Sequence, residues 1–395
     1  MQIINSSNFN YFFILTVLIL GLLPLNSQAI PAFARQTNMA CSSCHSAWPA
    51  LNAFGRQYKE HGYRLRHLQT PDKIITQNLK WNETLPVSVM LVARPYDKKK
   101  SGQKQNRALH EVELMVAGPM GEKMSGFFEV EAEDENKNNI GFDTGVSSAA
   151  LTYNMNEYAN LQFNWGSLTW FDPYNSYSNH LRLTRGGNAL IDHILDGADN
   201  GGKLNTPRQN TTLYGRPFKK LFYGISLSGD AGDSEGTSGD TVSIRLAYDV
   251  SSYFSIGVLG INGTCVANGG NCLVDRKYKR TAYDIQSEFA GVTFNAAIMS
   301  TEGDNASATA KVKKDTCYIQ AFYTFMEGGR ATWVPIIRYD QYDNTLGSKE
   351  VKDLITGLNY YFTENVRGMV EYLNRDSSIN TEDDERVTLQ LFAAF

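Results

Sequence analysis

The sequence predicts an all-β protein, an antiparallel β-barrel of about sixteen strands, preceded by a small α-helical domain. The first observation behind this fold class is a hydrophobic period of two from residue 83 onward, in runs such as "VSVMLVA", "SIRLAYDV" and "RVTLQLFAAF". Successive side chains of a strand point to opposite faces, so this alternation indicates strands with one apolar face. Clusters of Gly, Asn and Asp separate the runs and indicate turns.

The second observation is that short and long connections alternate. Sixteen strand-like runs begin near residues 83, 106, 124, 144, 157, 209, 218, 240, 253, 278, 291, 311, 331, 351, 365 and 384. Gaps after even-numbered runs are tight, as in "GPMGEK", "GRPF" and "EGGR", whereas gaps after odd-numbered runs are long and polar, as in "DAGDSEGTSG". Short turns on one rim and long loops on the other are typical of an outer-membrane barrel with both chain ends on the periplasmic side. The alternative, a soluble β-sandwich, gives no reason for this segregation.

The third observation is the aromatic content and the end of the chain. Tyr (21) and Phe (20) are in surplus and can supply the aromatic girdles of a membrane barrel. The chain ends on Phe395 in "TLQLFAAF", and an aromatic last residue is usual in bacterial outer-membrane barrels. The third long loop, at about residues 168–208, is the longest. We expect it to fold inward and narrow the channel, as third loops of sixteen-stranded porins often do.

The first 29 residues predict a signal peptide. Tyr11 to Leu25 form an apolar segment, and Ser27 and Ala29 are small residues that favour cleavage after Ala29. Residues 1–10 contain no Lys or Arg, so a retained membrane anchor is the alternative. The prediction is an exported chain with a small domain and linker at residues 30–80 and the barrel at residues 81–395. A net charge of −4 argues against a nucleic-acid partner.

The segment "CSSCH", Cys41 to His45, predicts one covalent c-type haem. Two thiols on one turn can add to the haem vinyl groups, and His45 can ligate the iron. A redox dithiol and half of a zinc site are the alternatives for Cys41 and Cys44. His61, His67 and Met39 are near enough to reach the other face of the iron, but the sequence assigns none of them as the sixth ligand.

Three further segments carry structural predictions. Residues 70–78, "TPDKIITQN", are polar and predict a linker, so that the small domain ends near residue 80. Cys265 and Cys272 in "TCVANGGNC" can close a short loop with a disulfide in an oxidising compartment, and two free thiols are the alternative. Cys317 falls within a predicted strand and receives no function.

Residues 31–63, "PAFARQTNMACSSCHSAWPALNAFGRQYKEHGY", resemble the start of the fused outer-membrane monohaem cytochrome–porins. Some members of that family are iron oxidases of Fe(II)-oxidising bacteria. The residues that carry the resemblance are Phe33, Ala34, Arg35, Gln36, Cys41, Cys44, His45, Pro49, Leu51, Phe54, Gly55, Arg56 and Tyr63. Barrel segments such as "LITGLNYYFTENVRGMVEYL" are similar to strands of phosphate-selective-type porins.

This resemblance implies electron transfer at the bacterial outer membrane. The expected function is to pass electrons from an extracellular donor, Fe(II) first, through one haem c to a periplasmic acceptor such as a cytochrome. The electron must cross an apolar band ~25 Å tall, so a single haem has to lie in the barrel or against its periplasmic side. This activity would make the chain an Fe(II) oxidase. The alternative is a passive solute or anion porin with an incidental haem domain.

Four glutamates predict a cation patch in the extracellular half of the channel. Glu111 and Glu113 share one face of the second strand, and Glu129 and Glu131 share one face of the third. Apolar residues between them must face lipid, so the glutamates face the lumen. A turn near residue 121 brings the two pairs side by side, and carboxylates suit a hard divalent cation. The alternative is that a porin interior is simply polar.

Overall fold

The computed structural model describes residues 31–65, 72–76, 79–82, 84–100, 102–134, 141–156, 158–178, 182–192, 203–237, 241–267, 272–305, 307–343, 350–378 and 384–395. Residues 31–395 form one compact unit. The predicted signal peptide and its cleavage site lie outside the described residues.

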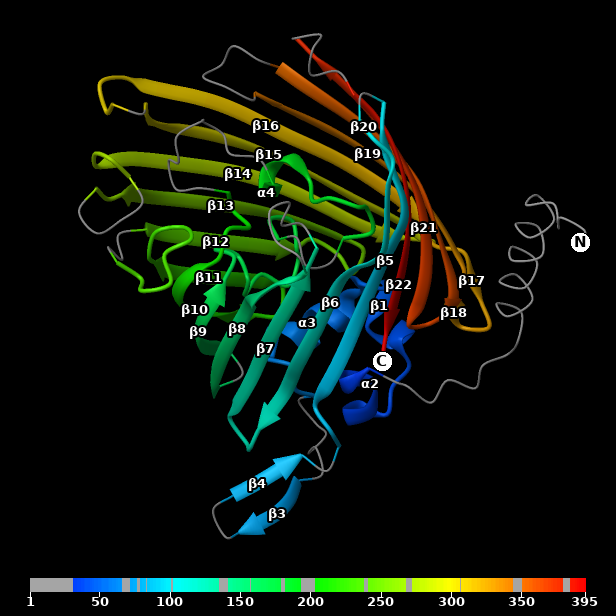
Figure 1. Ribbon diagram of the computed structural model, residues 1–395. Helices are drawn as coiled ribbons and strands as arrows, with labels where there is room; N and C mark the ends of the chain where they lie inside the picture. The colour runs from blue at the N-terminus through cyan, green and yellow to red at the C-terminus, as the bar shows by residue number, and fades with distance from the viewer. Residues whose placement is uncertain are drawn as a thin grey trace, which may run out of the picture. The chain divides into compact units, whose positions relative to one another are not determined.

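Sixteen antiparallel strands close into a barrel in chain order (Figure 1). They are β5 (Val87–Lys99), β6 (Gln105–Met120), β7 (Met124–Glu133), β8 (Asp143–Asn156), β9 (Ala159–Gly166), β10 (Arg208–Phe218), β11 (Leu221–Ser228), β12 (Thr241–Asp249), β13 (Phe254–Cys265), β14 (Arg276–Phe289), β15 (Val292–Asp304), β16 (Lys311–Tyr323), β19 (Trp333–Asp343), β20 (Glu350–Thr363), β21 (Val366–Ser377) and β22 (Asp384–Ala394). These strands confirm the predicted barrel. Each begins within four residues of its predicted start, and β5 differs most, beginning at Val87 instead of residue 83.

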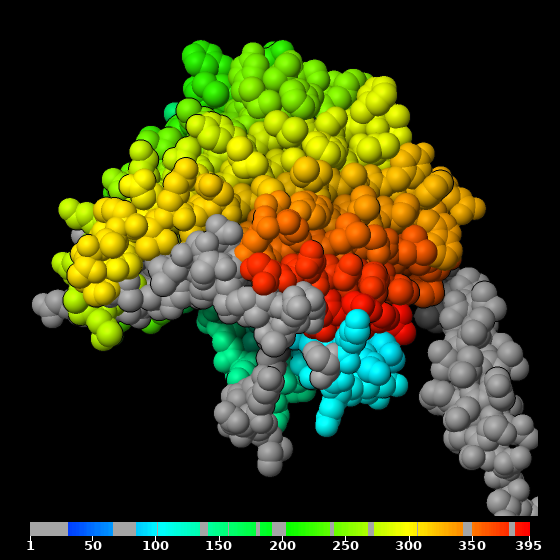
Figure 2. All heavy atoms as spheres, turned by 90° about the horizontal axis from the view of Figure 1, so that it is seen from above, coloured from blue at the N-terminus to red at the C-terminus, as the bar shows by residue number. Residues whose placement is uncertain are grey.

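The barrel closes between its first and last strands. β22 pairs with β5, and Val89 and Phe395 exchange backbone hydrogen bonds of 2.8 and 2.9 Å. Figure 2 shows one outer face of the wall, on which segments follow one another from green through yellow and orange to red. The first strands, in cyan, lie beside the last ones, in red. The terminal aromatic residue therefore takes part in closing the ring.

The wall is apolar outside and polar inside. In β12, Val242, Ile244 and Leu246 point outward with exposed fractions of 39%, 48% and 40%, whereas Ser243 and Arg245 point inward and are fully buried. Other strands repeat this alternation, for example β16 and β20. An apolar outer face has no favourable partner in water, so this wall requires a lipid environment. Among the described residues, no helix is both long and apolar enough to span a bilayer.

One rim of the barrel consists of tight turns. β14 and β15 are joined by two residues, Ala290 (φ 51°) and Gly291 (φ 83°), and two positive φ angles match the right-handed twist of a hairpin. The connection from β16 to β19 differs from the predicted tight turn, because it contains the small hairpin of β17 (Met326–Glu327) and β18 (Arg330–Ala331). The Gly328–Gly329 pair forms the tip of that hairpin.

A small N-terminal segment lies across this short-turn end. It contains α2 (Ala32–Thr37), the 3-10 helix η1 (Cys41–Ser43), β1 (His45–Ala47), β2 (Ala50–Leu51) and α3 (Ala53–Glu60). Figure 1 shows α2, α3 and β1 near the C-terminus and the lower ends of β5 and β22. Because these parts contact strand ends around the ring, we call residues 31–65 the plug.

Hydrogen bonds hold the plug against the wall. Ala32 N donates to Ser88 Oγ at 2.7 Å on β5, and Gln36 Nε2 donates to the Ala117 carbonyl at 2.8 Å on β6. On the opposite side of the motif, Tyr361 Oη of β20 donates to the Trp48 carbonyl at 2.6 Å. Further bonds reach the β6–β7, β8–β9 and β10–β11 turns.

The predicted linker is partly wrong. β3 (Asp72–Thr76) and β4 (Leu79–Asn82) pair as a two-stranded hairpin, with Lys73 opposite Trp81. Ile74, Ile75 and Thr76 are β-branched and favour a strand, but the run is too short to display a clear period. In Figure 1 this hairpin lies beyond the lower ends of the barrel strands.

Candidate functional site

The CSSCH motif occupies a tight turn beneath α3. η1 begins at Cys41, and Cys44 N donates back to the Cys41 carbonyl at 3.1 Å. A Cβ on Gly55 of α3 would lie 2.1 Å from the Cys44 carbonyl oxygen, so only glycine permits this approach. Asn52 caps α3 by accepting from Gly55 N at 2.9 Å, and its amide donates to the backbone of the turn at 3.1 Å. The helix and the motif are therefore one unit.

His45 has a defined tautomer. Its Nδ1 lies 2.9 Å from the Pro49 carbonyl oxygen, which can only accept, so Nδ1 carries the proton and Nε2 the free lone pair. Burial lowers the pKa of His45 to about 4, so the imidazole is neutral at pH 7. Metal-binding histidines usually donate their second ring N–H to such an acceptor. His45 thus meets the requirement for an axial ligand of haem iron.

The two motif thiols are free and half-buried. Burial, followed by the charge of Glu364, raises the pKa of Cys41 to about 12, and burial also raises the pKa of Cys44. A redox dithiol needs a lowered pKa, so these thiols do not suit thiol exchange. Among the described residues, no group of three potential metal ligands includes Cys41, Cys44 or His45. Free thiols beside a neutral histidine fit covalent attachment of a haem.

The positions considered for a sixth ligand remain open. His61 is the C-cap of α3, and its carbonyl accepts from Asn154 Nδ2 at 3.3 Å. Met39 lies between α2 and η1 and is half-buried. His67 lies outside the described residues.

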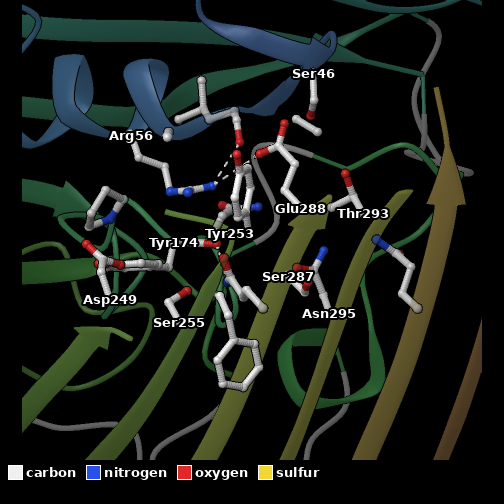
Figure 3. A pocket seen from close by; sticks show the side chains of 18 of the residues that line it. Ser46, Arg56, Tyr174, Asp249, Tyr253, Ser255, Ser287, Glu288, Thr293 and Asn295 are labelled. Carbon is white, nitrogen blue, oxygen red and sulfur yellow. Dashed lines mark hydrogen bonds and ion pairs between the residues drawn. The ribbon is translucent and has the colours of Figure 1, made fainter. Parts of the chain in front are cut away.

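A cavity of about 370 Å³ lies between the plug, the third loop and the wall (Figure 3). Arg56 of α3 points across it toward Glu288 at the end of β14, at 3.9 Å, and Tyr174 of the third loop stands beside Asp249. Cys41, Cys44 and His45 do not line it, although Ser46 does. The cavity extends from the short turns to the third loop, so the plug leaves space along this side of the lumen.

The described parts of the third loop, residues 167–178, 182–192 and 203–207, fold inward as predicted. The loop includes α4 (Ala189–Asp192). Arg245 of β12, fully buried, binds Asp172 of the loop at 3.1 Å and Asp284 of β14, and Ser176 Oγ and Tyr177 Oη also donate to Asp284. On the other side of the lumen, loop residues bond to β19, β20 and β21. The loop narrows the lumen from within.

The predicted carboxylate patch forms, with a different register. Glu111 pairs with Glu133 and Glu113 pairs with Glu131, two residues away from the predicted pairing, because the turn centres on residue 122. Ligand oxygens of Glu111, Glu113 and Glu131 lie within 4.8 Å of one another. Glu129 lies opposite Met115 and accepts from Ser148 Oγ at 2.6 Å, and its side chain also interacts with Glu113.

The patch predicted from the sequence did not include His110 and Glu133, which also belong to this region. His110, Glu111 and Glu133 also bring ligand atoms within 4.8 Å of one another. His110 and Glu111 are consecutive and both buried, and the β5–β6 register shifts beside them. The signal for this bulge is weak: "LHEVE" breaks the alternation of polar and apolar residues once.

The remaining cysteines have simple structural places. Cys265 and Cys272 form a disulfide with Cα atoms 5.8 Å apart, which closes the loop between β13 and β14. Cys317 is free within β16.

Solved structures similar to this chain are outer-membrane porins and channels. The anion-selective porin from Comamonas acidovorans aligns with a TM-score of 0.55 at 12% identity, over 78% of this chain and 98% of that one. Salmonella typhi OmpF, in complex with daunomycin, aligns with a TM-score of 0.56 at 16% identity, over 79% and 98%. The DcaP channel of Acinetobacter baumannii aligns with a TM-score of 0.51 at 13% identity, over 78% and 95%.

At these low identities the structural alignments show the fold alone: a sixteen-stranded barrel like that of outer-membrane porins. A small helical region precedes the barrel in this chain. No family model and no curated protein matches the sequence.

Proposed function

We propose that this chain is an outer-membrane barrel that carries one covalent haem on Cys41, Cys44 and His45 and passes electrons across the membrane. The observation that carries the proposal is the motif itself, with free thiols and a neutral His45 whose Nδ1 is engaged by Pro49. A bound haem c supplies one-electron redox chemistry. The donor is extracellular, with Fe(II) expected first, and the acceptor is periplasmic.

The plug supports this proposal by its location. With an even strand count, the chain ends and the short turns belong to the periplasmic side, and the plug contacts those turns. Cys41 N donates to Glu364 Oε2 at 2.8 Å in the β20–β21 turn, so the motif is bound to the rim. A periplasmic acceptor can approach this end, while the lumen admits a small donor from the long-loop end.

The residues of the plug have separate tasks. Cys41 and Cys44 hold the group covalently, and Pro49 orients the His45 ring by accepting from Nδ1. Gly55 and Asn52 fix α3 against the motif, which keeps these groups in place.

The first test is covalent haem staining of the full chain, expressed in a host with c-type haem maturation. We expect a haem-positive band at the mass of the chain on denaturing gels. Cys41→Ala with Cys44→Ala should remove it, and His45→Ala, which removes the axial ligand, should abolish reduction of the haem by Fe(II) that is kept outside proteoliposomes. Cys317→Ala is the matched control and should keep both signals, since Cys317 lies in the wall.

A double variant that retained the stain would overturn the haem assignment. A stained wild-type chain that Fe(II) cannot reduce would leave haem attachment intact and remove iron as the donor.

A passive solute porin is the second candidate, and the comparisons favour it, since the similar structures named above are porins or channels. The cavity beside the plug is the observation in this chain that agrees with it. A wild-type chain that remains without covalent haem during maturation would make this function the better supported one.

A further inference from the structure

We propose that His110, Glu111 and Glu133 bind one divalent transition-metal cation near the long-loop end of the barrel. The site itself is independent of the haem. Its role as the entry point of an Fe(II) donor rests on the proposed function.

The β-sheet geometry brings these three side chains together. Glu111 of β6 is directly opposite Glu133 of β7, and paired residues of antiparallel strands point to the same face. The bulge beside β5 turns His110 inward as well, so that its side chain is only 1% exposed. The outward neighbours are apolar, for example Leu109 and Leu114, each 41% exposed. Nitrogen and oxygen donors thus converge on one point inside the wall.

His110 is oriented by a residue outside this group of ligands. Its Nδ1 lies 2.6 Å from Asp134 Oδ1, and a carboxylate only accepts, so the proton is on Nδ1. In the neutral ring, Nε2 then has its lone pair available. A carboxylate behind a histidine is the usual support of a metal-binding imidazole, because it fixes the tautomer and raises the basicity of the ligand. The hydrogen bond from His110 to Asp134 therefore indicates, separately from the proximity of Glu111 and Glu133, that His110 can coordinate a metal.

The donor set indicates the class of ion. One imidazole and two carboxylates suit Fe(II), Mn(II) or Zn(II), whereas Ca²⁺ and Mg²⁺ prefer oxygen ligands alone. The ligand atoms lie within 4.8 Å of one another, and bonds of about 2.1 Å need them roughly 3 Å apart. Small rotations of the two Glu side chains close that difference.

Charged groups of both signs surround the site. Arg107 pairs with Asp134 at 3.3 Å, and its Nη1 lies 3.2 Å from His110 Nδ1, a contact without a hydrogen bond because Nδ1 donates to Asp134. Arg94 and Arg182 also place positive charge near His110 and Glu111. Six carboxyl groups lie on this part of β6 and β7 or directly beside it, those of Glu111, Glu113, Glu129, Glu131, Glu133 and Asp134. Glu111 belongs to both ligand groups, so it links the site to Glu113 and Glu131 one step deeper in the lumen.

The same face of β6 and β7 leads from the site to the plug. Below Glu113 and Glu131 come Met115 opposite Glu129 and then Ala117 opposite Phe127. The Phe127 ring lies 5.8 Å from Tyr63 of the plug, measured between centroids. A cation that leaves the His110 site therefore meets carboxylates on its way toward the plug.

The test is Mn(II) binding to the purified full chain, measured by loss of the free Mn(II) signal in electron paramagnetic resonance, with and without haem loading. We expect one ion per chain. His110→Gln and Glu133→Gln should weaken binding by at least tenfold, and Asp134→Asn, which removes the support of His110, by about 10–100-fold. Glu302→Gln removes a carboxylate from the exposed face at the long-loop end of β15 and should change nothing. A heat-shift gel verifies that each variant folds.

Two results would overturn the site: no stoichiometric binding by the wild type, or a His110→Gln variant that binds as tightly as the wild type, which would mean a diffuse carboxylate patch. Neither result affects haem staining. Conversely, Mn(II) binding by a chain that never attaches haem would leave this site intact while the electron-transfer function fails.

Discussion

At the scale of single residues, Arg216 holds the plug to the barrel. Its guanidinium bonds to both Glu60 oxygens at 3.0 to 3.2 Å, to Asp249 at 2.7 Å and to the Tyr174 hydroxyl at 2.9 Å. The Glu60 side chain is 3% exposed, so its charge is stabilised only through such partners. One side chain of β10 therefore joins α3, the β12 end and the third loop.

We expect Arg216→Met to loosen the plug without unfolding the barrel. Leaving a buried carboxylate without its cation costs about 3–5 kcal/mol, and each 1.4 kcal/mol is a tenfold change in an equilibrium. Protease cleavage within residues 31–65, followed by mass spectrometry in detergent, should accelerate at least tenfold. Lys219 is exposed and lies in the turn that follows β10, so the Lys219→Met variant should be cleaved at the wild-type rate. Equal rates for both variants would contradict the anchoring role.

At the scale of elements, the third loop is held by buried charge. Arg245 lies between Asp172 and Asp284, and Gly257 on the next strand leaves room for it, since a Cβ there would come within 2.2 Å of the guanidinium. Burial raises the pKa of Asp172, while Arg245 opposes this shift. The loop and the wall thus share one ion-pair cluster.

Arg245→Met should release the loop, because Asp172 and Asp284 then repel each other without the guanidinium between them. We expect single-channel conductance in planar bilayers to rise severalfold, as the loop leaves the lumen. Lys311→Met breaks the exposed pair with Asp304 at the long-loop end and serves as the control, with an effect near zero. A conductance unchanged by Arg245→Met would show that other contacts suffice to hold the loop.

At the scale of the whole molecule, the barrel and the plug depend on each other unequally. The sixteen strands form a closed ring of backbone hydrogen bonds, which needs no contribution from residues 31–65. The plug, in contrast, has only two short α-helices, one 3-10 turn and a small two-stranded sheet, and it is held in place by its contacts with the wall. Its removal should therefore open the lumen and leave the ring intact.

Deleting residues 31–65 behind the signal segment should raise conductance more than any single substitution, while heat-modifiable migration on gels stays unchanged. Deleting residues 72–82 instead removes the β3–β4 hairpin, which lies beyond the strand ends, and should leave conductance at the wild-type value. If the plug deletion also left it unchanged, the cavity beside the plug would already be the full path.

The sequence by itself determined the barrel and the motif. Alternating residues such as those of β12 indicate a strand because one face of the wall contacts lipid and the other contacts the polar lumen. The tight and long connections revealed the even count, and "CSSCH" is contiguous, so its chemistry is readable without a fold. These signals are local: the alternation within a strand repeats every two residues, and the CSSCH motif spans five residues.

Only the tertiary structure decided which distant side chains meet. The pairing of Glu111 with Glu133 depends on the residue at which the β6–β7 turn is centred, and the inward position of His110 depends on a bulge. Each is a shift of one or two residues along a strand, which the hydrophobic pattern of the sequence does not resolve. The plug contacts β5, β6, β10 and β20, separated by hundreds of residues. Such contacts follow from closing the ring, because closure brings the first and last strands together around a shared interior.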